Sequence, residues 1–495
     1  MKMKRFTAIS ALLCTLLLSL GACGGGSDTT DVQTDNTQAS VTEAVTVEES
    51  DGTEYLSLLP EGNFEGEQMR FLSRASTDTV VRYYSEVMAT ETNGETMNDA
   101  IYERTQRLEE RYGVTFVEER VDGVSAIYQK SYMAGEDNWD VIVDSIQEIT
   151  SRVVSNPIFM NLNDIPVDLT QPWWDVRVTD NLAIAGRRYV TIGAINNWTD
   201  SHTYGIVFNK ELAANYDLDL YAMVDNNEWT LDRFAEILKL ITADADGDGD
   251  MDEKDRYGAM GAYDNFGAFI VGCNLNIVQL DKDGYPRYNI DDRLITAATK
   301  IYEFMRGGDT LLANEYLHIS SDPWTDVIRV NFRAGNSLFG IGSVEQLQIF
   351  RNMETPIGLL PMPKYDTSLD YAHGFSYYWS SAIAVPASNT KPEMTGILLE
   401  ALNIDAYHTT KVAFYETVLE GKGIRDEESI RMLDIIRSTR DANFEDFFNY
   451  LNLNSIFNSL LQNRSIEKLT SSIESGMAKA EAKIEKSFAN ILAEE

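Results

Sequence analysis

Carboxylates at regular spacing make residues 244–255 the sharpest chemical motif in the chain. Acidic side chains stand at loop positions one, three, five, nine and twelve, and a glycine stands at position six. Ca²⁺ prefers several oxygen ligands, and alternate carboxylates along a tight loop converge on one point. The spacing predicts a structural calcium site. Its expected ligands are Asp244, Asp246, Asp248, Asp250 through its backbone carbonyl, Asp252 and Asp255.

This loop departs from an EF-hand in two respects. Asp255 stands at the twelfth position, where an EF-hand carries a glutamate, and no clear second helix follows. The motif is more similar to a single calcium loop of the dockerin type. Because an isolated loop lacks the paired helices that open in calcium sensors, a structural role is favoured over a sensing role. An acidic surface turn that binds no ion is the alternative.

The first residues have the pattern of an export signal. Lys2, Lys4 and Arg5 precede an uncharged apolar run over residues 8–20, and Leu-Gly-Ala-Cys follows at 20–23. This order is typical of a secretory signal, and the run is too short for a permanent membrane span. Residues 20–23 resemble the lipobox of bacterial lipoproteins, which implies cleavage of signal peptide 1–22 and acylation of Cys23, as by palmitate. The alternative is an ordinary signal peptide that contains a cysteine.

Composition limits what the mature chain can do. Residues 23–60 begin with a polar stretch almost without aromatic residues, which predicts a flexible tether. The formal net charge of −37 disfavours nucleic acid as a partner. Cys14 falls within the expected signal peptide, so Cys273 is left without a partner for an intramolecular disulfide, and its apolar surroundings favour a core position.

Strand-like and helix-like segments alternate along the remaining chain, which predicts an α/β fold. Predicted strands lie at 68–73, 114–121, 140–144, 204–208, 338–341, 356–362 and 382–385. One helix is expected to start at Asn98 as N-cap and to end at Gly113, and another to be capped by Thr230. A capping box is expected at 343–346. An apolar stripe from Ile466 to Ile491 predicts that the C-terminal segment is helical and packs on its own domain.

Several motifs, taken in order, resemble the family 1 extracellular solute-binding proteins of ABC importers, particularly the lipoproteins of Firmicutes. The matching segments are 98–104, 172–175, 205–212, 228–230, the calcium loop, 332–335, 358–363 and 382–386. The resemblance implies a periplasmic-binding-protein-like fold of type II with two α/β lobes joined by crossing strands. Lobe 1 would hold residues 61–200 and about 382–425, and lobe 2 would hold residues 201–381 and about 426–495.

The same resemblance implies a function and a site. Such proteins capture a solute, often a carbohydrate or oligosaccharide, in the cleft between the lobes and deliver it to a membrane permease without catalysis. The chain is thus expected to act as a monomer on the extracellular face of the cell membrane. Sugar clefts use aromatic faces and hydrogen-bonding side chains. The residues expected at the crossing strands are Trp379, Tyr378, Tyr377, Trp198, Asn197 and Asp200.

Two other classes of function stay open on the sequence. A surface glycoside hydrolase needs a pair of carboxylates, but no pair stands out among 78 acidic residues. A glycan-capture lipoprotein without a permease would share the fold, cleft and anchor. A serine or metal hydrolase is disfavoured because the four histidines are isolated and no nucleophile or zinc motif occurs.

Overall fold

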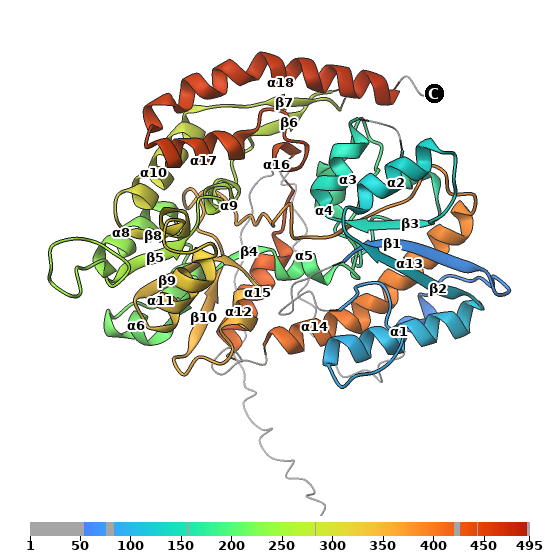
Figure 1. The fold of residues 1–495 in the computed structure, drawn as a ribbon, viewed down its shortest axis with the longest axis horizontal. Coiled ribbons are helices and arrows are strands. Elements are labelled where there is room, and N and C mark those ends of the chain that lie inside the picture. Colours follow the sequence, from blue (N-terminus) through green and yellow to red (C-terminus); the bar gives the residue numbers. More distant parts are fainter. Residues whose placement is uncertain are drawn as a thin grey trace, which may run out of the picture. The chain divides into compact units, whose positions relative to one another are not determined.

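The computed structural model describes residues 54–75, 84–155, 158–282, 284–419, 426–442 and 444–492 (Figure 1). The expected signal peptide, Cys23 and most of the expected tether lie outside these residues. The tether was predicted to reach residue 60, which is wrong for its last part. A 3₁₀ helix, η1 (Glu54–Ser57), buries Tyr55, whose ring stacks on His408 at 4.9 Å, and Leu59 is also buried. Tyr55 Oη also donates to Asp405 Oδ2 at 3.3 Å, so this short stretch packs against the folded domain.

Lobe 1 is built on a four-stranded sheet with the order β11-β3-β1-β2. The strands are β1 (Gln68–Arg74), β2 (Thr115–Val121), β3 (Val141–Asp144) and β11 (Ala382–Ala384). β1 pairs in parallel with β2 and β3, whereas β11 pairs antiparallel with β3. Strand β3 is buried along its whole length, as expected for an apolar run at the centre of a covered sheet.

Lobe 2 is built on a five-stranded mixed sheet with the order β10-β4-β9-β5-β8. The strands are β4 (Tyr204–Asn209), β5 (Tyr257–Gly261), β8 (Thr310–Leu312), β9 (Ser337–Ser343) and β10 (Ile357–Leu360). A separate hairpin joins β6 (Val278–Leu280) to β7 (Pro286–Tyr288). Strand β10 belongs to lobe 2 and β11 to lobe 1, so the chain crosses between the sheets over residues 361–381.

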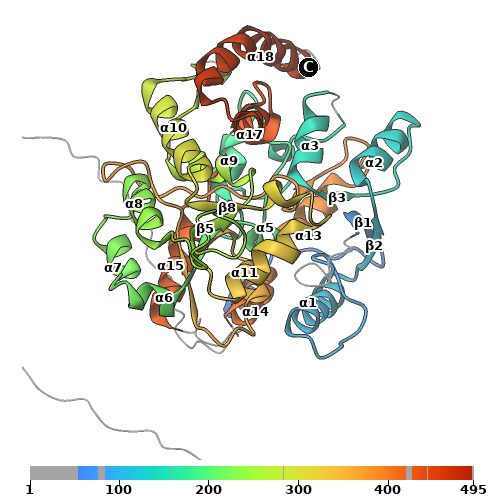
Figure 2. The same ribbon diagram turned by 60° about the vertical axis from the view of Figure 1, so that its left-hand side comes forward.

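Helices cover both sheets (Figures 1 and 2). Lobe 1 has α1 (Thr96–Tyr112), α2 (Val124–Met133), α3 (Ile146–Val153), α4 (Val176–Asn181), α13 (Pro392–His408) and α14 (Thr410–Val418). Lobe 2 has α6 (Lys210–Asn215), α7 (Leu220–Asp225), α8 (Leu231–Ile241), α9 (Asn265–Gly272), α10 (Asp292–Arg306), α11 (Val330–Arg333), α12 (Gln346–Ile349) and α15 (Glu427–Ser438). Short helical turns lie at η2 (Leu162–Asp164), η3 (Ala313–Tyr316) and η4 (Trp324–Arg329). None of the described helices is long and apolar enough to cross a bilayer.

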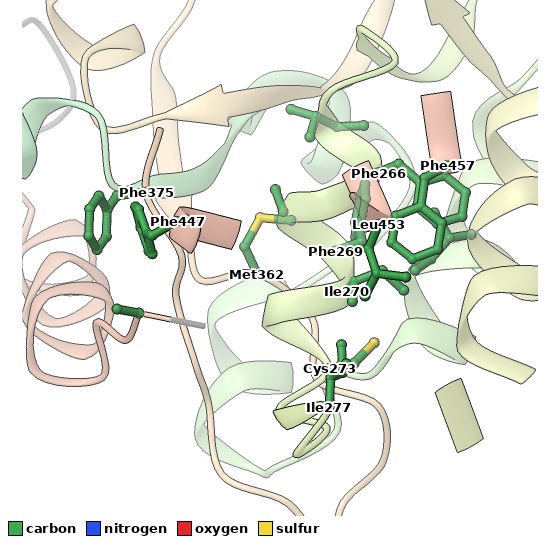
Figure 3. Packing of buried hydrophobic residues seen from close by; sticks show 14 of the residues in the cluster. Phe266, Phe269, Ile270, Cys273, Ile277, Met362, Phe375, Phe447, Leu453 and Phe457 are labelled. Atoms are coloured by element: carbon green, nitrogen blue, oxygen red, sulfur yellow. The ribbon is translucent and has the colours of Figure 1, made fainter. Parts of the chain in front are cut away.

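The C-terminal helices contact both lobes. They are α16 (Phe444–Phe448), α17 (Leu453–Asn463), η5 (Ile466–Lys468) and α18 (Leu469–Leu492). α16 packs on α3, and Thr150 Oγ1 donates to the Phe447 carbonyl at 2.9 Å. In both views α17 lies between α18 and α9. Phe266 of α9 stacks on Phe457 of α17 at 4.6 Å, within the apolar layer shown in Figure 3.

Most local expectations hold, and two are wrong. Gly113 ends α1 in the left-handed region, Thr230 caps α8, Cys273 is buried, and the stripe of α18 is packed inward. Helix α1 begins earlier than expected, at Thr96 after Glu95 as N-cap, since its first turns are held by Asp99 accepting from preceding backbone amides. The segment 343–346 forms no capping box. Ser343 still belongs to β9, and α12 starts at Gln346 without a side-chain cap.

Candidate functional site

Two crossing segments lie side by side where the lobes meet. Helix α5 (Asn197–Ser201) leads from lobe 1 into β4, and residues 376–381 lead back toward β11. Thr199 Oγ1 donates to the Ser381 carbonyl at 2.7 Å and accepts from the Ser381 amide at 3.1 Å. The Ser376 amide donates to the His202 carbonyl at 3.0 Å. These bonds fix the two segments against each other, so side chains on them are placed between the sheets.

A third crossing runs beside them after α15. His373 and Arg440 form a parallel bridge, with the His373 amide donating to the Thr439 carbonyl at 3.0 Å. The Met362 amide donates to His373 Nε2 at 3.0 Å, so the ring proton sits on Nδ1 and is donated to Thr439 Oγ1 at 2.7 Å. Burial lowers the pKa of His373 to about 3. The imidazole is therefore a neutral link between two crossings.

Asp200 is the centre of a buried ion-pair network at this junction. It pairs with Lys411 of α14 and with Arg440 Nη1 at 2.7 Å, and Arg440 Nε reaches Asp175 at 2.6 Å. Burial alone would raise the pKa of Asp200, but the charges of Lys411 and Arg440 lower it below its usual value. The predicted ligand residue Asp200 thus joins α5 to α14 and to the crossing at Arg440, with its side chain 3% exposed.

The main cavity at the junction lies on the lobe 2 side and has a volume of about 370 Å³. Its lining comes from the ends of β4 and β9, the start of α9, the η3–η4 connection and the crossing segment. Two tryptophans, Trp324 and Trp379, contribute aromatic surface. The polar lining residues are His202, Tyr204, Asp264, Asn265, Asn314, Ser321, Asp322, Ser343, Glu345 and Ser376. The cavity combines flat apolar faces with hydrogen-bonding groups.

Trp379 and Tyr378 are the exposed aromatic residues of the crossing segment, at 42% and 44%. Their rings meet edge to face at 4.5 Å. The Arg74 guanidinium, at the end of β1, lies 4.4 Å from the centre of the Tyr378 ring and donates to the Tyr378 carbonyl at 2.5 Å. Tyr377 is half-buried and lines a narrower recess together with Tyr204 and residues of α16 and α17. Of the three, only Trp379 lines the main cavity.

A small polar recess lies on the lobe 1 side, at the carboxyl ends of β1 and β3. Its titratable lining residues are Arg74, Glu86, Glu118, Arg120 and Asp144. The Trp198 amide donates to Glu86 Oε1 at 2.6 Å, and burial raises the pKa of Glu86 to about 8. Burial also raises the pKa values of Glu118 and Asp144. This recess holds carboxylates that bond internally to serines and backbone amides.

The remaining predicted site residues of α5 are buried. Trp198 is 4% exposed and Asn197 is fully buried, with its Nδ2 3.3 Å from the Ile195 carbonyl. Trp198 borders the lobe 1 recess rather than the main cavity. The structure therefore brings Trp379 to the main cavity, Trp198 to the recess and Asp200 to the network between them. Their roles in ligand binding stay predictions.

Trp324, Asp264 and Asp322 line the cavity but were not predicted from the sequence. The run Asp322-Pro323-Trp324 does carry a signal, since Asp and Pro are typical before the first turn of a helix. Asp322 Oδ1 accepts from the Thr325 amide at 3.2 Å, as that signal indicates. Nothing in the local sequence, however, shows that this turn faces Trp379 of a segment more than fifty residues later.

The predicted calcium loop brings three of its carboxylates together. Asp244, Asp246 and Asp255 each place an oxygen within 4.8 Å of the others. Asp255 is buried and accepts from the Ala245 and Asp252 amides, each at 2.8 Å. Gly249 adopts a φ of +89°, which supports the turn expected at position six. Asp248, Asp250 and Asp252 lie outside this group of three, and Asp252 pairs with Lys254 at 3.0 Å.

Comparisons with known proteins identify the fold. No protein-family model matches the chain, and no curated protein matches its sequence. A cyclo/maltodextrin-binding protein complexed with maltotetraose is similar in structure, with 10% identity, a TM-score of 0.54, and coverage of 86% of this chain and 98% of that one. The chain has the two-lobed fold of ABC substrate-binding proteins. This result confirms the expected fold class, with its mixed α/β lobes and crossing segments.

Two further structures support the substrate-binding fold. A sugar transporter from Rhizobium etli in an open conformation is 12% identical, with a TM-score of 0.55 and coverage of 83% of this chain and 99% of that one. An ABC substrate-binding protein from Listeria monocytogenes in complex with cycloalternan is 12% identical, with a TM-score of 0.50 and coverage of 86% and 98%. These matches extend over nearly the whole length of each relative, so both lobes are shared.

Proposed function

We propose that this protein is an extracellular solute-binding protein that captures a carbohydrate between its lobes and passes it to an ABC importer. The observation that carries the proposal is the 370 Å³ cavity at the lobe junction, where the exposed Trp379 faces polar side chains. The similar structures named above include sugar binders with the same two lobes. An aromatic face suits the C–H surface of a sugar ring, and the polar lining suits its hydroxyls.

The amide side chains of the cavity fit this role. Asn265 Oδ1 accepts from the Ala262 amide and Asn314 Oδ1 accepts from the Tyr263 amide, each at 2.7 Å. Both oxygens are thus used within the protein, so a hydrogen bond from either side chain to a ligand hydroxyl would be donated by Nδ2. The carboxylates of Asp264 and Asp322 are acceptors only. A sugar hydroxyl both donates and accepts, so this mixture of groups complements it.

Removal of the Trp379 side chain is expected to weaken saccharide binding by roughly ten-fold or more, because about 1–2 kcal/mol of stacking and apolar burial is lost. The measurement is a thermal-shift screen of oligosaccharides, peptides and other solutes, followed by calorimetric titration of the best ligand with wild type and Trp379→Ala. The matched control is Trp139→Ala, because Trp139 is partly buried and lines neither the main cavity nor the lobe 1 recess. Turnover of the ligand in the same samples would contradict the proposal and show that the protein is an enzyme.

The membrane anchor is a separate part of the proposal. The lipobox-like segment before Cys23 supports acylation of that cysteine and a position on the extracellular face of the membrane. The mass of the mature N-terminal peptide from the native host tests it. An unmodified cysteine in that peptide contradicts the anchor without affecting the cavity.

We also propose that residues 244–255 bind Ca²⁺ as a structural ion. Asp244, Asp246 and Asp255 supply the oxygens that the loop brings together. Millimolar Ca²⁺ is expected to raise the melting temperature of the untethered domain by about one to a few degrees, because the ion binds only the folded loop. Asp246→Asn should abolish this response, whereas the exposed control Glu236→Gln should keep it. An equal response in both variants would assign the effect to another site.

A further inference from the structure

The charged groups of the main cavity are unevenly distributed. Its described lining contains the acidic residues Asp264, Asp322 and Glu345 and a single histidine, His202, but neither lysine nor arginine. Sugar hydroxyls both donate and accept hydrogen bonds, so a polar lining by itself does not select one class of saccharide. The sign of the charge nevertheless limits which ionic ligands can enter.

Glu345 is compensated by its neighbour. His202 Nε2 lies 3.1 Å from Glu345 Oε2, and His202 Nδ1 lies 2.7 Å from the Trp198 carbonyl. A carbonyl only accepts, so Nδ1 is the donor in that contact and Nε2 is the nitrogen that faces Glu345. This pair therefore adds no net charge to the cavity when Nε2 is protonated as well.

Asp264 and Asp322 have no such compensation. Within the described part of the chain, no lysine, arginine or histidine nitrogen lies within ion-pair distance of either carboxylate. Both residues line the cavity, Asp264 directly before α9 and Asp322 before η4. Both have solvent-exposed surface, and desolvation of the Asp264 carboxyl raises its pKa. Two negative charges thus remain in a concave site where part of the solvent is excluded.

Arg74 of lobe 1, which lies against the Trp379 ring, already has other partners. Arg74 donates to the Tyr378 carbonyl and lies against the Tyr378 and Trp379 rings at 4.4 and 5.5 Å. It shares the lobe 1 recess with Asp144, where burial raises the pKa of the carboxyl and the positive charge of Arg74 opposes that rise. Arg74 lines the lobe 1 recess rather than the main cavity, so it does not neutralise Asp264 or Asp322.

We propose that the main cavity selects neutral or basic saccharides and that Asp264 and Asp322 are the residues that reject acidic ones. The inference rests on the proposed function and narrows its ligand class. A carboxylate or sulfate on the sugar would lie within several ångströms of an uncompensated negative charge. Such a contact costs roughly ten-fold or more in affinity at the effective dielectric of a partly closed site. An amine at the same place increases the affinity instead, through attraction to the carboxylates and through contact with the tryptophan faces.

The test uses matched saccharides that differ in charge. Neutral disaccharides, their uronate counterparts and their amino counterparts are screened by thermal shift, and dissociation constants are then measured by calorimetry at low and at physiological salt. We expect the uronate to bind at least ten-fold more weakly than its neutral parent, with the difference shrinking as salt screens the charges. An uronate that binds wild type as tightly as its parent overturns the inference and leaves the proposed function intact.

A variant cycle assigns the effect to these residues. In Asp264→Asn and Asp322→Asn the ratio of uronate to neutral dissociation constants should fall by several-fold for each substitution, whereas Glu474→Gln, an exposed carboxylate on α18, should leave the ratio unchanged. The ratio is informative even if either variant binds all sugars less tightly. An unchanged ratio in both cavity variants refutes the role of these two residues. Absence of binding by every saccharide class would refute the proposed function itself, and the inference with it.

Discussion

Replacement of Arg440 by methionine is expected to lower the free energy of unfolding by about 3–5 kcal/mol. Arg440 pairs with Asp200 at 2.7 Å and with Asp175 at 2.6 Å, and its side chain is 8% exposed. Methionine fills much of the same volume but leaves two carboxylates, 3% and 11% exposed, without that partner. Uncompensated buried charge is what makes the loss large. Urea unfolding at pH 7, followed by circular dichroism, measures it.

The matched control is an exposed arginine pair. Arg431 contacts Asp225 at 2.7 Å, but both side chains are more than two-fifths exposed. Water and salt screen this pair, so Arg431→Met is expected to cost less than about 1 kcal/mol. Both variants lose an ion pair, so the difference between their costs measures the effect of burying the pair. Similar costs for the two variants would show that the network at the lobe junction does not stabilise the fold.

Acidification below pH 6.5 is expected to destabilise the protein through His373. Its folded pKa is lowered to about 3 by burial, whereas the unfolded side chain titrates near 6.5. Between these values the unfolded chain binds one more proton, so stability rises with pH there and is lost as pH falls. At pH 4.5 the loss from this group alone amounts to about 2–3 kcal/mol.

A variant isolates this contribution from other groups. Glu86 acts in the opposite sense, because its raised pKa of about 8 makes stability fall as pH rises from 4.5 to 8. His373→Gln removes only the histidine contribution. The cost of this substitution at pH 4.5 should therefore be about 2–3 kcal/mol smaller than its cost at pH 7. His318→Gln, at an exposed histidine, is the control. An identical cost at the two pH values would rule out proton uptake at His373.

Local sequence patterns predicted some strands of the two sheets but not all of them. β1, β3, β4 and β11 lie where strands were predicted, and β3 follows from a short apolar run, as expected for a strand that is buried along its length. β5, β8 and the β6–β7 hairpin were not predicted. β5 reads Tyr-Gly-Ala-Met-Gly, and its two glycines carry no strand signal. Gly258 is required there by close packing, since a Cβ would lie 2.4 Å from the backbone of Leu238.

The candidate site was predicted only in part. Trp379 was singled out from its position before β11, and it does line the main cavity. Asp200 was expected to contact the ligand, but it forms buried ion pairs with Lys411 and Arg440. Both partners lie more than two hundred residues away in sequence. Side-chain partners of that sequence separation leave no local pattern. The same holds for Trp324, which the fold of lobe 2 brings to the cavity.

The sequence by itself determined the α/β class, the positions of several strands and the acidic loop at 244–255, because each depends on neighbours in the chain. The aromatic crossing segment was expected from the resemblance to solute-binding proteins. Its expectations for Cys23 and for Ca²⁺ remain proposals. Only the tertiary structure decided which aromatic residues face the cavity, which acids are neutralised and which stay uncompensated. Those outcomes depend on distances between segments far apart in sequence. Packing of the two lobes and of the described crossing segments sets these distances, and no periodicity along the chain records them.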